Sequence, residues 1–230
     1  MIKIVSYNIR YSLKIDDAIA LIQNSPALSN ADVICLQEMV PGGVEKIAKA
    51  LQYKFIYHAA TYHSKIKEDF GNAVLSKWPI LDHSKIVLPK LGLAKMRRIA
   101  VRARLRIQDE DITVVCVHLS ILATAAERKI LIRLILDSIP SSTQYCVIAG
   151  DFNTFTQKST ETIVSAFKEG GYHLATRQLN FSYRHWYLFN KKSVLDHIFC
   201  KGFNIVSTGK VSDFSPSDHL PIWAELQFDK

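Results

Sequence analysis

The sequence has no hydrophobic run long enough to cross a membrane and no cysteine pair of the C-x-x-C type. Its longest apolar segments, residues 112–117 and 146–149, have the length of strands, whereas a membrane helix needs about 20 apolar residues. Residues 1–6 are typical of a strand and lack the apolar core and cleavage site of a signal peptide. We therefore expect a cytoplasmic protein without a transmembrane segment.

Cysteine is scarce, and each of the four cysteines lies within an apolar, strand-like segment. This placement favours buried, reduced thiols over the alternatives of a zinc site or a disulfide framework. The residues concerned are Cys35, Cys116, Cys146 and Cys200. Repeats, low-complexity segments and Gly/Pro/Ser-rich linkers are also absent, so we expect a single domain over residues 1–230.

Positive charge is in excess, with 29 Lys and Arg residues against 21 Asp and Glu residues. The formal net charge of +8 favours anionic partners, namely nucleic acid, phosphorylated metabolites or an acidic membrane surface. Because many basic proteins bind none of these, the charge supports such partners only together with other signals. The hydrophobic content of 48% is that of an ordinary globular protein.

Hydrophobic periodicity predicts a mixture of strands and helices. Strands are predicted at residues 2–7, 32–37, 55–59, 73–76, 99–107, 112–118, 146–149, 194–200 and 220–228. Helices are predicted at residues 16–22, 43–51 and 160–168, and after a capping box at Thr124–Glu127, where Ile130, Leu131, Leu134 and Ile135 recur at helical spacing. Too many strands follow one another directly for a doubly wound sheet. The pattern predicts an α/β (α+β) fold of two packed mixed sheets flanked by helices.

Polar residues recur where apolar strands end, which is where a rigid sheet presents functional groups. The residues are Asn8, Glu38, His118, Asp151, Asn153, Asp196, Asp218 and His219. Taken singly, Asn8 and the segment 150–153 could be turns, His118 a core histidine, and the segment 218–219 a surface loop. Taken together, they supply oxygen ligands suited to a hard cation as well as two histidines.

The ordered set resembles the endonuclease/exonuclease/phosphatase superfamily, which includes deoxyribonuclease I. The matching segments span nearly the whole chain. They are Ser6-Tyr7-Asn8, Leu36-Gln37-Glu38, Gly71-Asn72-Ala73-Val74-Leu75-Ser76, His118-Leu119-Ser120, Gly150-Asp151-Phe152-Asn153, Leu195-Asp196-His197-Ile198-Phe199 and Ser217-Asp218-His219-Leu220-Pro221. The resemblance implies a four-layered α/β sandwich, in agreement with the two-sheet prediction.

The resemblance also implies roles for individual residues. Glu38 would be the principal ligand of a catalytic Mg²⁺ or Mn²⁺, with Asn8 and Asp218 close to the metal. Asp151 and Asn153 would position and activate the attacking water. His219, oriented by Asp196, would contact the phosphate, and His118 would bind the phosphate or assist the leaving oxygen. Asn72 and Arg98 are predicted to bind the substrate.

The substrate is less well specified than the chemistry. The segment 115–120 departs from the pattern of AP endonucleases, and no membrane-facing insertion of the sphingomyelinase kind is visible. The basic face of Arg102, Arg104 and Arg106 could follow phosphates or merely be solvated. An aromatic cluster of Tyr183, His185, Trp186 and Tyr187 could stack on bases, line a lipid path or pack in the core.

The main hypothesis is a metal-dependent phosphodiesterase that acts on nucleic acid. The alternatives are a lipid or inositol phosphate phosphohydrolase, for which the basic charge would allow peripheral contact with an anionic membrane, and a binding protein without catalysis. Because fold resemblance cannot select a substrate, these alternatives stay open at this stage.

Overall fold

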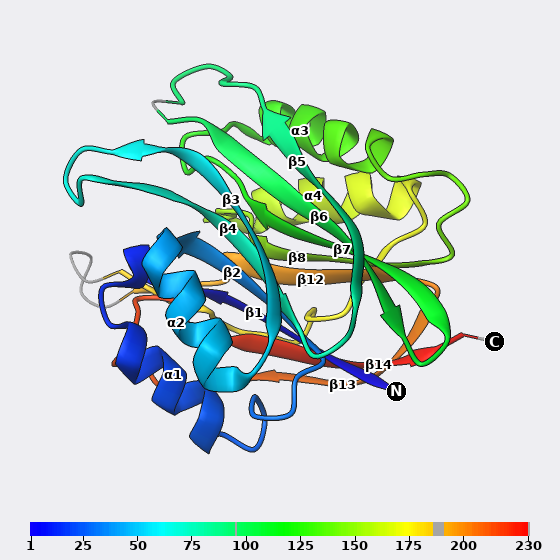
Figure 1. Ribbon diagram of the computed structural model, residues 1–230. Coiled ribbons are helices and arrows are strands. Elements are labelled where there is room, and N and C mark those ends of the chain that lie inside the picture. Colours follow the sequence, from blue (N-terminus) through cyan, green and yellow to red (C-terminus); the bar gives the residue numbers. More distant parts are fainter. Residues whose placement is uncertain (95, 186–190, 230) are drawn as a thin grey trace.

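The computed structural model describes residues 1–94, 96–185 and 191–229. Two six-stranded sheets pack face to face, and helices cover the outer face of each sheet (Figure 1). The order of the layers is therefore helix, sheet, sheet, helix. This arrangement confirms the predicted fold class.

The first sheet has the strand order β13-β14-β1-β2-β4-β3. Its strands are β1 (Ile2–Asn8), β2 (Val33–Met39), β3 (Lys54–His63), β4 (Glu68–Ser76), β13 (Phe203–Lys210) and β14 (Ile222–Phe228). Its outer face is covered by α1 (Ile15–Asn24) and α2 (Pro41–Leu51), and a short 3-10 turn, η1 (Arg10–Ser12), follows β1.

The second sheet has the strand order β5-β6-β7-β8-β12-β9. Its strands are β5 (Ile80–Leu88), β6 (Arg98–Ile107), β7 (Glu110–His118), β8 (Tyr145–Asp151), β9 (His173–Leu174) and β12 (Asp196–Lys201). The helices α3 (Ala125–Asp137) and α4 (Gln157–Glu169) cover it, and β10 (Tyr183–Arg184) pairs with β11 (Lys192–Ser193) in a separate small hairpin. None of the helices that the structure describes is long and apolar enough to cross a membrane.

Alternation along the strands produces three hydrophobic layers. In β1, Ile4 faces the core between the sheets, whereas Val5 faces the core beneath α1 and α2. In β8, Val147 faces the central core and Ile148 packs beneath α3 and α4. Successive side chains of a strand point to opposite faces, so both faces of these central strands are buried and their sequences are mostly apolar.

The helix predicted after the capping box is present as α3, but only part of its apolar residues face the sheet. Ile130 and Leu134 are 51% and 41% exposed, whereas Leu131, Ile132 and Ile135 are buried. The helix turns Arg128 toward the sheet, three residues before Leu131, and this rotates Ile130 outward. The capping box is confirmed, because Thr124 accepts from the Glu127 backbone and Glu127 accepts from the Thr124 backbone.

Other sequence predictions stand with small changes. The four cysteines are free and buried, as predicted. The helix α4 begins three residues earlier than expected, at Gln157, because the Thr156 hydroxyl accepts from the Ser159 backbone and caps it there. Trp186 and Tyr187 of the predicted aromatic cluster lie outside the described residues.

The chain direction brings the polar strand ends to one edge of the molecule. In the parallel pair β1 and β2, Asn8 is the last residue of β1 and Glu38 the last but one of β2. The parallel pair β7 and β8 ends with His118 and Asp151. Gly150 makes the approach of β8 to β7 possible, since a Cβ there would lie 1.9 Å from the Val117 carbonyl oxygen. Both termini lie at the other end of the sandwich (Figure 1).

Candidate active site

The two sheets are joined at this edge by a hydrogen bond between their strand ends. Asn8 of β1 donates its amide to the Asp151 carboxylate of β8 over 3.1 Å. Asp196, at the start of β12, pairs with Asp151 in the strand register. The sandwich therefore holds residues that are 143 positions apart in direct contact.

Glu38 lies in a β-bulge of β2. The register of β2 against β4 shifts between Leu36 and Met39, and Glu38 has a φ of 56°. A non-glycine residue in this left-handed region is strained, and bulges next to active sites redirect side chains. The bulge points the Glu38 carboxylate toward the edge, with Oε1 3.9 Å from His118 Nε2.

A buried chain of charged groups runs from Asp196 through His219 to Asp151. His219 Nδ1 lies 2.9 Å from Asp196 Oδ2, and His219 Nε2 lies 3.7 Å from Asp151 Oδ2. Burial alone would lower the pKa of His219, but the charges of Asp196 and Asp151 outweigh it and raise the pKa to about 10. The imidazole is therefore a proton donor on both nitrogens.

Asp151 is held by amide groups. Its Oδ1 accepts from the Asn153 backbone over 2.9 Å, and its Oδ2 accepts from the side-chain amides of Asn153 and Asn8. Burial raises the pKa of Asp151, the charges of Asp196 and Glu38 raise it further, and His219 opposes them. A carboxylate with a raised pKa is a stronger base than a free aspartate.

His118 completes the cluster. Its Nε2 lies 3.6 Å from Asp151 Oδ2, and the side chain is buried. Burial, together with the positive charges of Arg98 and His219, holds the pKa of His118 well below its usual value. The surroundings therefore shift the pKa values of the two neighbouring histidines in opposite directions.

The residues predicted to bind substrate differ in their availability. Arg98 lies with its guanidinium 5.3 Å from the centre of the Phe70 ring, and its Nη1 is buried without a hydrogen-bond partner among the described residues. Asn72 instead donates its amide to the Ile99 carbonyl over 3.0 Å, which joins β4 to β6. Only its side-chain oxygen is left for a substrate.

Asp218 and Asn8 each have a partner already. Arg10 Nε lies 3.7 Å from Asp218 Oδ2, and the Arg10 backbone donates to Asn8 Oδ1 over 3.1 Å. Burial raises the pKa of Glu38. The positive charges of Arg98 and His219 lower this pKa, and the negative charge of Asp218 raises it further. That repulsion indicates that carboxylates are crowded at the strand ends.

The arginine face of β6 does not reach the cluster. Arg104 and Arg106 lie far along β6 from Arg98, and both pair with Asp111 of β7. At about 3.3 Å per residue, Arg104 lies roughly 20 Å from the strand end. By contrast, Tyr183 of the aromatic cluster packs against His219, with 4.7 Å between the ring centres.

A family model matches most of the chain. The model of the Endonuclease/Exonuclease/phosphatase family matches residues 5–219. The chain belongs to the endonuclease/exonuclease/phosphatase family. This family comprises phosphoester hydrolases that generally depend on a divalent metal. A search of curated proteins found no match.

Several solved structures share the fold at low sequence identity. An endonuclease/exonuclease/phosphatase family protein from Leptotrichia buccalis is 17% identical with a TM-score of 0.79, over 99% of this chain and 100% of that chain. Mannosyl-6-phosphatase from Bacteroides thetaiotaomicron is 18% identical, with a TM-score of 0.76 over 99% of this chain and 100% of that chain. TDP2 from D. rerio, complexed with a single-strand DNA product, has the same identity and TM-score over 98% of both chains.

Sequence reasoning missed Arg128, a buried arginine that supports the site of this family member. Its guanidinium donates to the carbonyl oxygens of Phe152 and Asn153 over 3.2 and 2.7 Å, and to those of Ser120 and Ala123. It thus connects the loop after His118 with the loop after Asp151. The apolar helical pattern of α3 gave no signal for it; only the interruption of the pattern by a charge could have done so.

Replacing Arg128 with Met is expected to lower the free energy of unfolding by about 3 kcal/mol, because buried carbonyls lose their donors. Arg133→Met, on the exposed face of the same helix, should change it by less than about 0.5 kcal/mol. Urea unfolding of both variants measures the difference. Equal effects of the two substitutions would show that Arg128 does not support the site.

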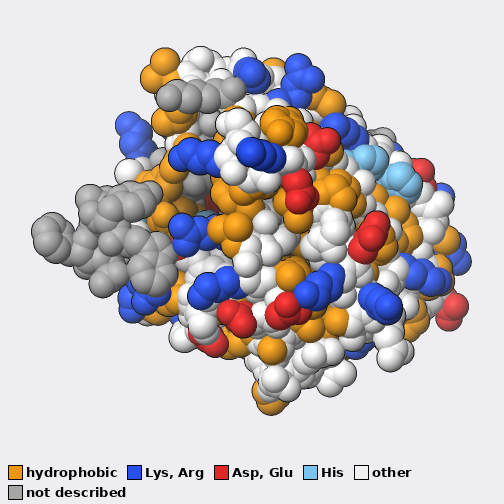
Figure 2. Space-filling view, turned by 60° about the vertical axis from the view of Figure 1, so that its left-hand side comes forward, with side chains coloured by type: hydrophobic (Ala, Val, Ile, Leu, Met, Phe, Trp, Pro, Cys, Tyr) orange, Lys and Arg blue, Asp and Glu red, His pale blue; other side chains and the backbone are white. Residues whose placement is uncertain are grey.

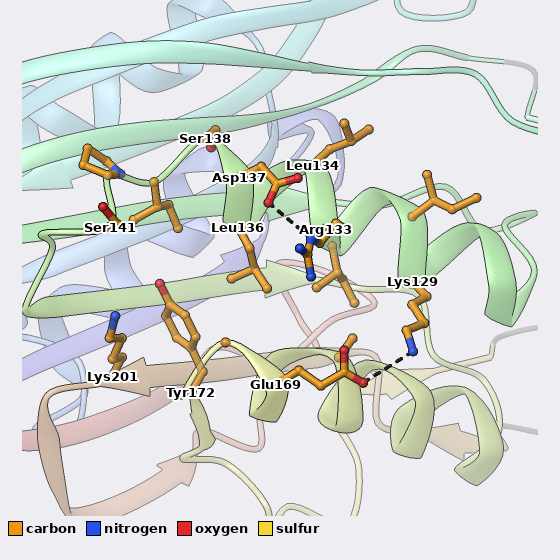
Figure 3. A pocket seen from close by; sticks show the side chains of 16 residues that line it. Lys129, Arg133, Leu134, Leu136, Asp137, Ser138, Ser141, Glu169, Tyr172 and Lys201 are labelled. Atoms are coloured by element: carbon orange, nitrogen blue, oxygen red, sulfur yellow. Dashed lines mark hydrogen bonds and ion pairs between the residues drawn. The ribbon is translucent and has the colours of Figure 1, made fainter.

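A separate hollow of about 1050 Å³ lies away from the strand ends, between α3 and α4 (Figure 3). Apolar side chains such as Leu136 line it, and the ion pairs Lys129–Glu169 and Arg133–Asp137 lie along it. None of the residues of the strand-end cluster lines this hollow. The chemistry suggested by the motifs therefore belongs to the edge of the sandwich.

Proposed function

We propose that the protein is a divalent-metal-dependent phosphodiesterase that cleaves nucleic acid by in-line attack of water. The observation that carries the proposal is the buried chain from Asp196 through His219 to Asp151, next to Glu38. It combines a base, a proton donor and a second carboxylate, Glu38, within one cluster. The family match supports the phosphoesterase class, and the substrate and the metal are our proposals.

The donor set fits a hard cation such as Mg²⁺ or Mn²⁺. Glu38 has no cationic hydrogen-bond partner among the described residues, and the nearby charge of Asp218 repels it. Ligand atoms of Asp151, Asp196 and His219 also lie within 4.8 Å of one another. His219 and Asp196 form a hydrogen-bonded charge pair over 2.9 Å, whereas Arg10 stays 3.7 Å from Asp218, so we assign the cation to Glu38 and Asp218, with Asn8 beside it. When bound, the cation would offset the negative charge that develops on the phosphate and the leaving oxygen.

The protein's own residues would then divide the remaining steps. Asp151, fixed by Asn8 and Asn153, would accept the proton of the attacking water. His219, kept protonated by Asp196, would donate to a phosphoryl oxygen. His118 would contact the phosphate or the leaving oxygen, and Arg98 would direct its unpartnered Nη1 to a phosphate oxygen.

Three observations favour nucleic acid as the substrate. The net charge is +8, Lys and Arg side chains surround a hollow on the strand-end face (Figure 2), and a solved structure with the same fold holds a single-strand DNA product. The fold is shared equally with a mannosyl-6-phosphatase. Lipid, inositol and sugar phosphates are therefore the substrates against which nucleic acid has to be compared.

A substrate panel with Mg²⁺ tests this assignment. We expect turnover of single-stranded DNA or RNA to exceed that of sphingomyelin, inositol polyphosphates and mannose 6-phosphate. Nucleic-acid affinity should fall roughly 10³-fold or more between low and moderate salt if about six phosphates are contacted. Faster turnover of a lipid, inositol or sugar phosphate, or an affinity indifferent to salt, would overturn the choice of substrate.

A further inference from the structure

We propose that a basic hollow beside the catalytic cluster binds a second phosphate group of the substrate, next to the one that is cleaved. This inference rests on the proposed function and names a subsite for it. The hollow measures about 430 Å³ and lies between the segment after β1 and residues 212–217. Three cationic side chains line it, Arg10, Lys14 and Arg184, against one carboxylate, Asp213.

The hollow shares a wall with the catalytic cluster. Ser217 lines it, and the Ser217 hydroxyl donates to the Asn8 carbonyl over 2.8 Å and accepts from the His219 backbone over 3.2 Å. Arg10 lies 3.7 Å from Asp218, while the Arg184 backbone donates to the Asp218 carbonyl over 3.0 Å. A phosphate in the hollow would therefore be a near neighbour of a phosphate at His219.

The cationic side chains are positioned by the loop itself. Lys14 donates its Nζ to the Ser215 carbonyl over 2.8 Å, and the Arg184 guanidinium lies 4.4 Å from the centre of the Phe214 ring. The Asp213 carboxylate accepts from the backbone and hydroxyl of Ser215. The three cations face two carboxylates, Asp213 in the lining and Asp218 beside Arg10, so an excess of positive charge remains, which suits an anion with several oxygens.

Backbone strain at the rim supports a functional role. Arg10, Tyr11 and Ser12 have φ values of 40°, 56° and 57°, so three consecutive non-glycine residues are left-handed. Such conformations are costly, and they cluster at functional sites. The strained turn directs Arg10 to Asp218, while the Tyr11 ring packs 4.6 Å from the ring of His63 on the other side.

The chemistry of the hollow matches a chain of phosphates better than a single phosphate. In a nucleic acid strand each nucleotide adds a phosphate, so the phosphate that flanks the cleaved one always lies close to it. Guanidinium groups bind phosphate oxygens in pairs, and a lysine adds a further charge. A phosphorylated inositol presents the same pair of phosphates, and the test distinguishes the two sources.

The test compares ligands with and without the second phosphate by calorimetry, with the full chain in Mg²⁺. The nucleic-acid arm uses a phosphorothioate dithymidine with and without a 5′-phosphate, and the inositol arm uses inositol bisphosphate against inositol monophosphate. We expect the second phosphate to tighten binding at least about tenfold in one arm, and that arm identifies the source.

Substitutions test whether the tighter binding caused by the second phosphate arises in the hollow. Lys14→Gln should reduce the gain to less than about threefold, and Lys14→Arg should restore it. Lys129→Gln is the matched control, an exposed lysine with one contact, on α3. The proposal is overturned if neither arm shows a gain, or if Lys14→Gln leaves the gain unchanged. Turnover of bis-p-nitrophenyl phosphate by the same wild-type preparation tests the proposed function separately, because the binding measurement needs no turnover.

Discussion

Replacing Asp151 with Asn is expected to lower phosphodiester hydrolysis by about 10²- to 10⁴-fold, the usual contribution of a general base. The substitution keeps the size of the side chain and an oxygen for the Asn153 backbone, but it removes the carboxylate. It also removes a charge that keeps His219 protonated. The proton acceptor and the proton donor should therefore be weakened together.

The measurement is kcat and KM with bis-p-nitrophenyl phosphate across the pH range, alongside His219→Ala. We expect both variants to lose kcat by comparable factors, because each group is proposed to act in the transition state. Asp137→Asn, an exposed carboxylate on α3, serves as the control. A rate near that of the wild type for Asp151→Asn would refute its assignment as the base.

Replacing Glu38 with Gln is expected to lower turnover at least about 10³-fold at fixed Mg²⁺, because a neutral amide is a poor substitute for the anionic ligand. The concentration of metal needed for half-maximal activity should rise as well. Glu45→Gln, an exposed glutamate on α2, should behave like the wild type. Unchanged metal dependence in Glu38→Gln would place the cation elsewhere, such as at Asp151, Asp196 and His219.

The strained backbone of Glu38 offers a second, independent measurement. Because its φ is 56°, Glu38→Gly should remove the strain together with the carboxylate. The free energy of unfolding should stay the same or rise by up to about 1 kcal/mol, while activity is lost. A marked loss of stability would mean that the Glu38 side chain supports the fold and not the chemistry.

The strand-end residues could be predicted from the sequence because buried central strands give a strong signal. Asn8, Glu38, His118 and Asp151 each follow an almost wholly apolar segment, and parallel strands end at the same edge. The order of the motifs then identified the family. The distances that join the two sheets could not be predicted, because they depend on how the sheets pack.

Edge strands and buried charges gave much weaker signals. No strand was assigned to β5 or β13, which lie at sheet edges and are largely exposed, so apolar and polar residues do not alternate clearly along them. Arg128 was hidden because its partners are backbone carbonyls, which leave no trace in a sequence. Asn72 matched a motif, yet its amide is used to join strands.

The most direct test of the account is the metal dependence of a purified, metal-stripped preparation. After exhaustive treatment with EDTA and dialysis, we predict no hydrolysis of bis-p-nitrophenyl phosphate, followed by recovery as Mg²⁺ or Mn²⁺ is added. Circular dichroism before and after stripping establishes that the fold is retained. Full activity without metal would contradict the account, as would a failure of both metals to produce any hydrolysis in the folded protein.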